Sequence, residues 1–277
     1  NNLSNAKAVG IDKKHMKTQL SLVENVSTHI DGISEGVDKL TKSLGKADEI
    51  NDIRKQSIAF CEKVKPIFDE IREHVDNMMT ERAKNGTPYI FSRIQSSYAG
   101  PFDDIELPTH STQPDWEAEL ALVFKKGGTK ISRENAMDHV AGYLVVNDIT
   151  NRDQIFTADP KDLGADWLHA KHSPGFFPMG PMIVPAKFVA NPHDLRITLK
   201  LNGETMQNEK TDDMIFDIPR QIETLSKYAR IMTGDVLATG SPSGNGTHYN
   251  RYLQDGDVME VSVEGLGTQV TRCVAAK

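Results

Sequence analysis

The chain of 277 residues carries 39 acidic and 32 basic side chains, a formal net charge of −7, and is 38% hydrophobic and 26% charged. These values are typical of a globular protein and exclude a disordered or fibrous chain. The acidic balance and the lack of a basic stripe argue against a nucleic-acid partner. No apolar run approaches the roughly 18 residues that a membrane-spanning helix needs, so we expect no membrane span.

The first part of the chain has the apolar periodicity of helices. Between residues 26 and 44 apolar side chains recur at alternating gaps of four and three, which places them on one helix face. A second helical pattern runs from Ile50 to Met78, and we expect Pro66 to kink or interrupt it. Residues 1–85 are therefore predicted to form a helical N-terminal region that packs on itself, on the rest of the chain or on a second subunit.

The pattern changes at the turn-forming residues 85–88, after which short alternating or β-branched stretches recur. Helices are expected between them over Arg133–His139 and Ile218–Ala229. This order matches neither a βαβ repeat nor a Rossmann pattern, so the predicted fold class is α+β, with residues 86–277 as a second domain. The expected strands are Tyr89–Arg93, Trp116–Phe124, Tyr143–Asn147, Leu195–Leu201 and Val258–Val263.

Two glycine-containing segments have different meanings. Asn202-Gly203 follows an alternating stretch and predicts a tight hairpin turn. The segment Gly244-Asn245-Gly246 lacks the further glycine of a dinucleotide-binding fingerprint, so no nucleotide site is indicated.

Two glutamates lie in the predicted strand around residue 118. Strand alternation puts Glu117 and Glu119 on one face and apolar side chains on the other. Two adjacent carboxylates repel each other unless one binds a proton or both share a cation. Such oxygen ligands suit a hard divalent ion, Mg²⁺, Mn²⁺ or Ca²⁺. An exposed strand face is the alternative explanation.

Two further charged residues adjoin apolar stretches. Asp148 follows the predicted strand that ends at Asn147, where it could be a ligand or could cap a turn. Lys171 follows Trp167-Leu168-His169-Ala170, where its ammonium could pair with acids or hold a substrate carboxylate, or could be solvated.

Taken together, these segments resemble the fumarylacetoacetate hydrolase family, and in particular its bacterial maleylpyruvate and fumarylpyruvate hydrolases. The resemblance covers about Pro88 to Val274. The segments that carry it, in chain order, are Tyr89-Ile90-Phe91-Ser92-Arg93, Asp115-Trp116-Glu117-Ala118-Glu119-Leu120-Ala121, Gly142-Tyr143, Asn147-Asp148-Ile149-Thr150-Asn151-Arg152-Asp153, Ala170-Lys171, Leu201-Asn202-Gly203-Glu204 and Thr239-Gly240-Ser241-Pro242-Ser243-Gly244.

The resemblance implies a β-roll or β-sandwich with a mixed-sheet core over residues 86–277, preceded by the helical N-terminal segment. It also implies a homodimer. In this family Mg²⁺ or Mn²⁺ is bound by two glutamates and an aspartate, which correspond here to Glu117, Glu119 and Asp148.

The substrate-binding residues follow from the same resemblance. Lys171 is implied to contact the oxo or carboxylate oxygens of the substrate. Ser241 stands where the family usually has a threonine that contacts the substrate carboxylate, and Arg93 stands where a lysine is common, which replaces a point donor with a planar fork. Gln154 is implied as a further ligand, although it directly follows Asp153, whereas the family has one residue between them.

The general base is where the sequence departs most from the family. Many members carry a His-x-x-Glu pair that activates the attacking water, but none of the nine histidines here is followed by Glu at the third position. We expect His248, in the glycine-containing stretch that begins at Ser241, to act as the base. His110, His172 and a water on the metal are the alternatives.

The implied reaction is metal-dependent hydrolysis of the C–C bond of a small β-diketo acid. An acylpyruvate such as maleylpyruvate or fumarylpyruvate would give pyruvate and a carboxylic acid, as in the breakdown of aromatic compounds. A 2-oxo acid decarboxylase or isomerase, or a dehydratase, of the same family is the alternative, because the same metal site serves several reactions and a decarboxylase or isomerase needs no activated water. A metal-binding protein without activity is a third.

The two cysteines, Cys61 and Cys273, are far apart in the sequence and have no metal-type spacing. This usage predicts a reducing, cytoplasmic setting.

Overall fold

The computed structural model describes residues 55–60, 62–67, 69–70, 81, 84–156 and 165–276. By its internal contacts the chain divides between Asn85 and Gly86, and each unit is described by itself. The described residues of the first unit are helical. The helix predicted over residues 26–44 and most of the second helical pattern lie outside the described residues, so the helical N-terminal region stays a prediction.

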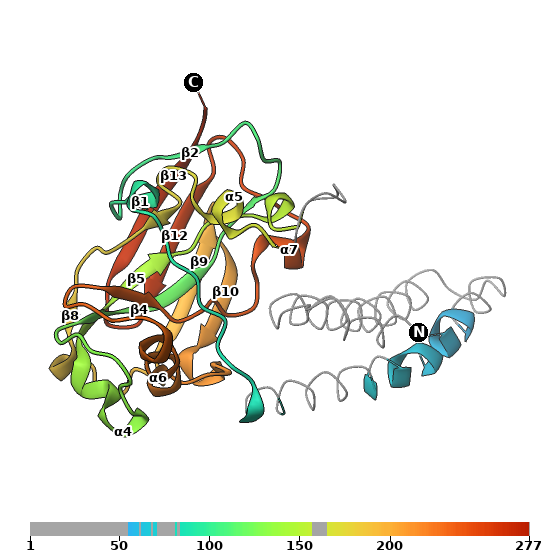
Figure 1. Cartoon of the computed structure of the whole chain (residues 1–277). Coiled ribbons are helices and arrows are strands. Elements are labelled where there is room, and N and C mark those ends of the chain that lie inside the picture. Colours follow the sequence, from blue (N-terminus) through green and yellow to red (C-terminus); the bar gives the residue numbers. More distant parts are fainter. Residues whose placement is uncertain are drawn as a thin grey trace. The chain divides into compact units, whose positions relative to one another are not determined.

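The second unit is built around two larger sheets, which Figure 1 shows crossing the middle of this unit. One sheet has five strands in the order β10-β9-β12-β13-β2, all antiparallel except the parallel pair β13 and β2. Its strands are β2 (Ile105–Leu107), β9 (Arg196–Leu201), β10 (Glu204–Lys210), β12 (Val258–Val263) and β13 (Thr268–Ala275).

The other large sheet has four antiparallel strands in the order β11-β4-β5-β8. They are β4 (Ala118–Phe124), β5 (Val140–Asn147), β8 (Val184–Pro185) and β11 (Val236–Ala238). Two short pairs complete the strands: β1 (Tyr98–Ala99) with β7 (Phe177–Pro178), and β3 (Pro114–Asp115) with β6 (Thr150–Asn151).

The two larger sheets share one hydrophobic core. Strands β4 and β5 pack against β9 and β12, and their inward side chains are fully shielded from water. Burial of this apolar area is the main force that holds the sheets together. Four of these residues, one from each strand, are Leu120, Val145, Leu199 and Val261.

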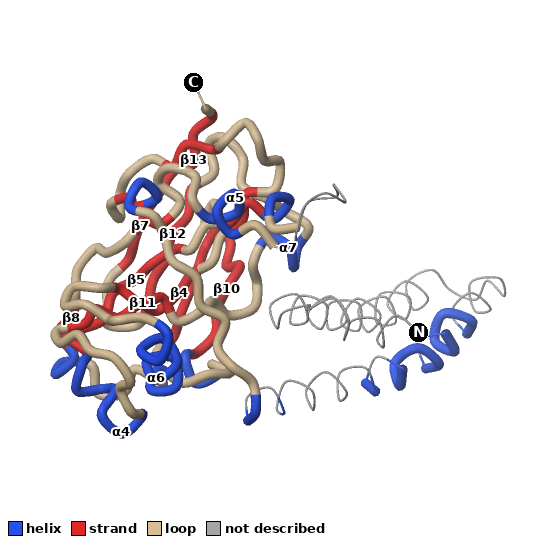
Figure 2. The backbone as a smooth tube through the Cα atoms, viewed as in Figure 1, coloured by secondary structure: helices blue, strands red, loops and turns tan. Residues whose placement is uncertain are grey.

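Short helices lie at the ends of the sheets, and Figure 2 shows them in blue around the red strands. The α-helices are α4 (Arg133–Ala136), α5 (Trp167–Lys171), α6 (Ile218–Tyr228) and α7 (Gly246–Tyr249). The 3-10 turns are Gln95–Ser97, Met137–His139, Arg152–Gln154, Ala186–Phe188 and Thr211–Asp213. Helix α6 begins where the Asp217 side chain accepts a hydrogen bond from the Arg220 N–H at 2.8 Å, the usual role of an N-cap aspartate. Within the described residues, no helix is long and apolar enough to cross a membrane.

The prediction of α+β structure is confirmed, and so is the hairpin at Asn202-Gly203. Asn202 and Gly203 both have positive φ, 53° and 84°, as a two-residue turn between β9 and β10 requires. The finer description of the fold as a β-roll or β-sandwich stays a prediction.

The strand predicted over Tyr89–Arg93 is wrong, because these residues have no regular secondary structure. Side-chain packing holds this segment in place of sheet pairing. Phe91 stacks on Trp167 with ring centroids 5.0 Å apart, and the Tyr89 ring lies 5.5 Å from the same indole. The strands β10 and β13 were not predicted, because their sequences are rich in polar residues.

Candidate active site

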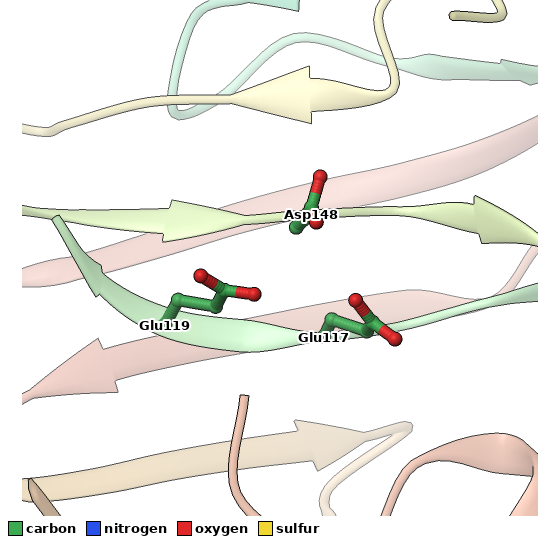
Figure 3. Close-up of side chains that lie close together, drawn as sticks. All are labelled: Glu117, Glu119 and Asp148. Atoms are coloured by element: carbon green, nitrogen blue, oxygen red, sulfur yellow. The ribbon is translucent and has the colours of Figure 1, made fainter. Parts of the chain in front are cut away.

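Three carboxylates meet where β4 begins and β5 ends. Ala118 pairs with Asn147, so Glu117 and Asp148, one residue beyond this pair on each strand, come together, and the Asp148 N–H donates to the Glu117 carbonyl at 2.8 Å. Glu117 directly precedes β4 and shares a side with Glu119 on that strand, and Asp148 directly follows the neighbouring strand β5 (Figure 3). All three are buried, with 1%, 4% and 6% exposure, and their carboxylate oxygens lie within 4.8 Å of one another.

Lys171, at the end of α5, projects its ammonium into this cluster. Its Nζ donates to Glu117 Oε2 at 2.8 Å, to the Asp148 carbonyl at 3.0 Å and to the Asp148 carboxylate. The side chain is 1% exposed. Burial lowers the pKa of Lys171 to about 8, a shift that the Asp148 carboxylate opposes and that Arg93 and Arg152 increase. The ammonium therefore compensates charge inside the cluster.

Arg93 holds the other side of Asp148. Its Nε donates to Asp148 Oδ1 at 2.9 Å, and its Nη2 binds the same oxygen and the carbonyls of Ile149 and Phe176 at 3.0 and 3.1 Å. The remaining nitrogen, Nη1, is buried and has no hydrogen-bond partner among the described residues. Arg93 therefore lies at the cluster and has one further buried donor group, while its role toward substrate stays a prediction.

Asp115 and Arg152 belong to the site although the sequence did not single them out. Arg152 Nε donates to Asp115 Oδ2 at 2.6 Å, and its Nη2 lies 2.6 Å from Glu117 Oε1. Asp115 also accepts from the Gly246 N–H, and from the N–H and hydroxyl of Thr247 at 3.2 and 3.1 Å. Both residues lie in segments that resemble the family, but the ion pair between them forms only when the chain is folded, because they are far apart in the sequence.

Ser241 follows a residue that touches the cluster directly. The N–H of Gly240 donates to Glu119 Oε2 at 2.7 Å, which fixes both the glutamate and the start of the loop. The Ser241 hydroxyl accepts from Gln207 Nε2 at 3.0 Å. Ser241 is thus the residue after one that binds the cluster, and its contact with a substrate carboxylate stays a prediction.

Gln154 and His248 are the two other residues that the sequence predicted for the site. Gln154 Nε2 donates to the His110 carbonyl at 3.0 Å, and this hydrogen bond connects the side chain to the loop before β3. His248 is half-buried on α7 with its ring edge-on to Tyr249, 4.4 Å between centroids. Burial lowers the pKa of His248, which favours the neutral imidazole that a general base needs. Its neighbour Thr247 is one of the residues that donate to Asp115.

The two alternative histidines differ in their surroundings. The His172 ring nitrogens lie against backbone carbonyl oxygens, Nε2 at 2.9 Å from Ser92 and Nδ1 at 3.1 Å from Trp167 and Leu168. A ring held on both sides by acceptors has no lone pair directed at a water, which argues against His172 as the base. His110 is exposed on a loop.

The three carboxylates fit a hard divalent cation. Each offers an oxygen, the donors are mutually close, and they are buried enough to exclude bulk water. Carboxylate oxygen is the ligand type that Mg²⁺ and Mn²⁺ prefer, whereas softer metals favour sulfur or imidazole. Glu117, Glu119 and Asp148 are therefore the residues that would hold such an ion.

A buried group of carboxylates and one ammonium is costly to fold and is typical of an enzyme active site. Residues 65–274 match the family model for the C-terminal domain of fumarylacetoacetate (FAA) hydrolase. The chain belongs to this family, whose members are enzymes and include hydrolases. The match begins upstream of Pro88, where the resemblance was expected to start.

Relatives of this chain are named for different reactions. The human mitochondrial oxaloacetate tautomerase FAHD2B is 38% identical over 189 residues, 68% of this chain and 59% of that protein. The 2,4-didehydro-3-deoxy-L-rhamnonate hydrolase of Sphingomonas sp. (strain SKA58) is 38% identical over 185 residues, 66% of this chain and 63% of that protein. This chain therefore spans about three fifths of the length of these curated relatives.

The structure is also similar to solved members of the family. The fumarylpyruvate hydrolase from Pseudomonas aeruginosa, solved in complex with Mn²⁺ and pyruvate, superposes with a TM-score of 0.62 at 27% identity. The alignment covers 70% of this chain and 81% of that one. Hydrolases and a tautomerase thus stand among the similar proteins, and the family alone does not fix the reaction.

Proposed function

We propose that this protein is a metal-dependent hydrolase that cleaves the C–C bond of an acylpyruvate, such as maleylpyruvate or fumarylpyruvate, to pyruvate and a carboxylic acid. The observation that carries the proposal is the position of Lys171, whose buried ammonium lies between Glu117 and Asp148. A fixed positive charge beside a divalent-ion site suits a reaction in which negative charge develops on an oxo oxygen. The similar rhamnonate and fumarylpyruvate hydrolases support it.

Each part of the site has a role in this reaction. Mg²⁺ or Mn²⁺, held by Glu117, Glu119 and Asp148, would supply positive charge to the carboxylate and neighbouring oxo oxygen of the substrate. Lys171 would stabilise the same oxygens as they gain charge. The remaining donor of Arg93 and the hydroxyl of Ser241 suit the substrate carboxylate.

The bond changes balance without a further co-reactant. His248 takes a proton from water, and the resulting oxygen nucleophile forms a bond to the carbonyl carbon distal to the pyruvate part. The C–C bond beside that carbon then breaks, and its electron pair passes to the pyruvate part as an enolate. Protonation of the enolate carbon by the imidazolium gives pyruvate and restores His248.

Tautomerisation of a 2-oxo acid such as oxaloacetate is the second candidate. Two observations favour it: the 38% identity to the human oxaloacetate tautomerase, and the lack of a His-x-x-Glu pair in the sequence. A tautomerase only moves a proton between carbon and oxygen, so it needs no activated water. The same cations would stabilise the enol form.

The test is direct. The full chain is incubated with Mg²⁺ or Mn²⁺ and either acylpyruvates or oxaloacetate, while the diketo-enolate absorbance is followed and products are identified by mass. Pyruvate and the matching acid support hydrolysis. Faster keto–enol exchange of oxaloacetate without acylpyruvate cleavage supports the tautomerase and overturns the hydrolase.

Two variants connect the outcome to the site. Lys171→Met should abolish the turnover that the wild type shows, whichever reaction it is. Lys125→Met is the matched control, because Lys125 is exposed and directly follows Phe124, the end of β4 opposite the carboxylates.

A further inference from the structure

A buried glutamine connects the carboxylate strand to the loop that carries Ser241. Gln207 is 1% exposed and lies on β10. Its Oε1 accepts the N–H of Ala118 at 3.0 Å, the residue between the two glutamates. Its Nε2 donates to Ser241 Oγ and the Pro242 carbonyl, both at 3.0 Å, and to the Ser243 carbonyl at 3.3 Å.

A break in strand register turns Gln207 toward this loop. The pairing of β10 with β9 shifts between Thr205 and Gln207, and such an irregularity re-aims the side chains beside it. The backbone comes very close at the same place, since a Cβ on Gly244 would lie 2.1 Å from the Met206 carbonyl oxygen. The Tyr249 hydroxyl donates to that same carbonyl at 2.9 Å.

The chemistry of the partners fixes the orientation of the amide. The Ala118 N–H can only donate, so it must face the oxygen of Gln207. The two loop carbonyls can only accept, so they must face the nitrogen. In a flipped amide, the Gln207 NH₂ group would face the Ala118 N–H and the Gln207 oxygen would face the two loop carbonyls. Neither arrangement forms a hydrogen bond, and a lost hydrogen bond is costly for a buried group.

This orientation in turn sets the polarity of the Ser241 hydroxyl. Its oxygen already accepts from Gln207, so its own proton points elsewhere. Among the described residues the acceptor for that proton is the Pro242 carbonyl at 3.5 Å, the limit of a hydrogen bond, and this carbonyl already receives a proton from Gln207. The hydroxyl is therefore a donor available to an anionic group.

We propose that Gln207 is a positioning residue that makes Ser241 a hydrogen-bond donor toward a carboxylate group of the bound 2-oxo acid. The inference rests on the proposed function for the class of ligand. Gln207 itself does not touch the ligand and acts through Ser241 alone, so the effect of replacing Gln207 must depend on the Ser241 hydroxyl.

A double-mutant cycle tests this dependence, with oxalate as the probe. Oxalate binding to the full chain with Mn²⁺ is titrated for the wild type, Gln207→Met, Ser241→Ala and the double variant. We expect Gln207→Met to weaken binding about tenfold when Ser241 is present and less than about twofold when it is replaced. Equal losses in both backgrounds, no loss, or no oxalate binding by the wild type would overturn the proposal.

Gln207→Glu covers the case in which the methionine variant does not fold. It keeps the oxygen that accepts the Ala118 N–H and has nearly the same volume, while an ionised carboxylate cannot donate to Ser241. Any repulsion of oxalate by the new charge would also occur in the Ser241→Ala background. The difference in the loss of oxalate affinity between the two backgrounds therefore measures the contribution of the Ser241 hydroxyl.

The outcome is separate from that of the proposed function. If the effects of the Gln207 and Ser241 substitutions on oxalate binding are coupled but the protein cleaves no acylpyruvate, the proposed function is overturned and the role of Gln207 is supported. If the two effects are additive and the protein does cleave acylpyruvates, the proposed function is supported and the role of Gln207 is overturned.

Discussion

Arg152 Nη2 lies 2.6 Å from Glu117 Oε1, and the arginine side chain is 10% exposed and the glutamate 1%. The other side of the same guanidinium binds Asp115, so one arginine joins a predicted metal ligand to the residue that anchors α7. The cluster and helix α7, which carries His248, are thus parts of one bonded assembly.

Replacing this arginine should strongly destabilise the protein. Arg152→Met leaves the buried Asp115 without its cation and leaves Glu117 paired with Lys171 alone, which costs about 3–5 kcal/mol in the free energy of unfolding. Arg133→Met is the matched control, because its pair with Glu223 is exposed and should cost at most about 1 kcal/mol. Urea denaturation of both variants measures the two values, and equal costs would contradict the buried-pair explanation.

Metal affinity should depend on the three clustered carboxylates. Glu119→Gln removes a charged oxygen ligand and is expected to weaken Mn²⁺ binding at least about tenfold, as followed by titration with Mn²⁺ electron paramagnetic resonance. Saturating Mn²⁺ should also raise the melting temperature of the wild type, and a chelator should reverse this. Glu223→Gln is the control, and equal Mn²⁺ affinity in both variants would remove the cluster as the metal site.

The pH dependence of the reaction should report His248. A general base acts in its neutral form, and burial lowers the pKa of His248 below the usual 6.5. The imidazole therefore stays neutral to lower pH, and kcat/KM should fall only below about pH 6.5. His248→Asn should reduce kcat by about a hundredfold or more, while His110→Asn should change little. An acid limb that persists unchanged in the residual activity of His248→Asn would assign it to another group.

Among the described residues the free thiol is that of Cys273 in the sheet core, and it should be unreactive. Burial raises the pKa of Cys273 to about 12, helped by nearby Asp257, so the thiolate that alkylation requires is scarce at pH 8. In a Cys61→Ser background, we expect iodoacetamide to leave the folded protein unmodified and to alkylate Cys273 in urea. Mass spectrometry distinguishes the two, and rapid native alkylation would show that the strand opens.

Two glycine substitutions should separate steric clash from backbone strain. Gly203 and Gly244 both have positive φ, 84° and 91°, but a Cβ meets nothing within 4 Å at Gly203 and lies 2.1 Å from the Met206 carbonyl oxygen at Gly244. Gly203→Ala should cost about 1–2 kcal/mol. Gly244→Ala should cost at least about 2 kcal/mol more, measured by urea denaturation, and similar costs would mean that the loop moves easily.

Local pattern predicted part of this site. Alternation placed Glu117 and Glu119 on the same side, and the end of an apolar run identified Asp148. The meeting of these residues required the register of β4 against β5. For Lys171 the local pattern left pairing with acids, binding of a substrate carboxylate and solvation open, and the family resemblance selected contact with the substrate. The wrong strand at Tyr89–Arg93 had suitable residues but no neighbouring strand, because strand propensity measures fit to a sheet that must exist elsewhere.

The residues that sequence reasoning missed act over long distances. Gln207 looks like any polar residue of a half-exposed hairpin, and its burial depends on a register shift that no local pattern reveals. Asp115 lies 131 residues from the glycine whose N–H it accepts. Such side chains satisfy backbone groups of distant loops, and only the assembled fold identifies those groups.

The formal charges of the assembly have a consequence for the order of ligand binding. Four carboxylates face three cationic side chains, which leaves one negative charge in surplus; the residues are Asp115, Glu117, Glu119, Asp148, Arg93, Arg152 and Lys171. A divalent ion reverses the sign and leaves one positive charge. The anionic substrate of the proposed reaction would therefore be repelled before the ion binds and attracted afterwards. The kinetics should be ordered, with the ion first and the organic acid second.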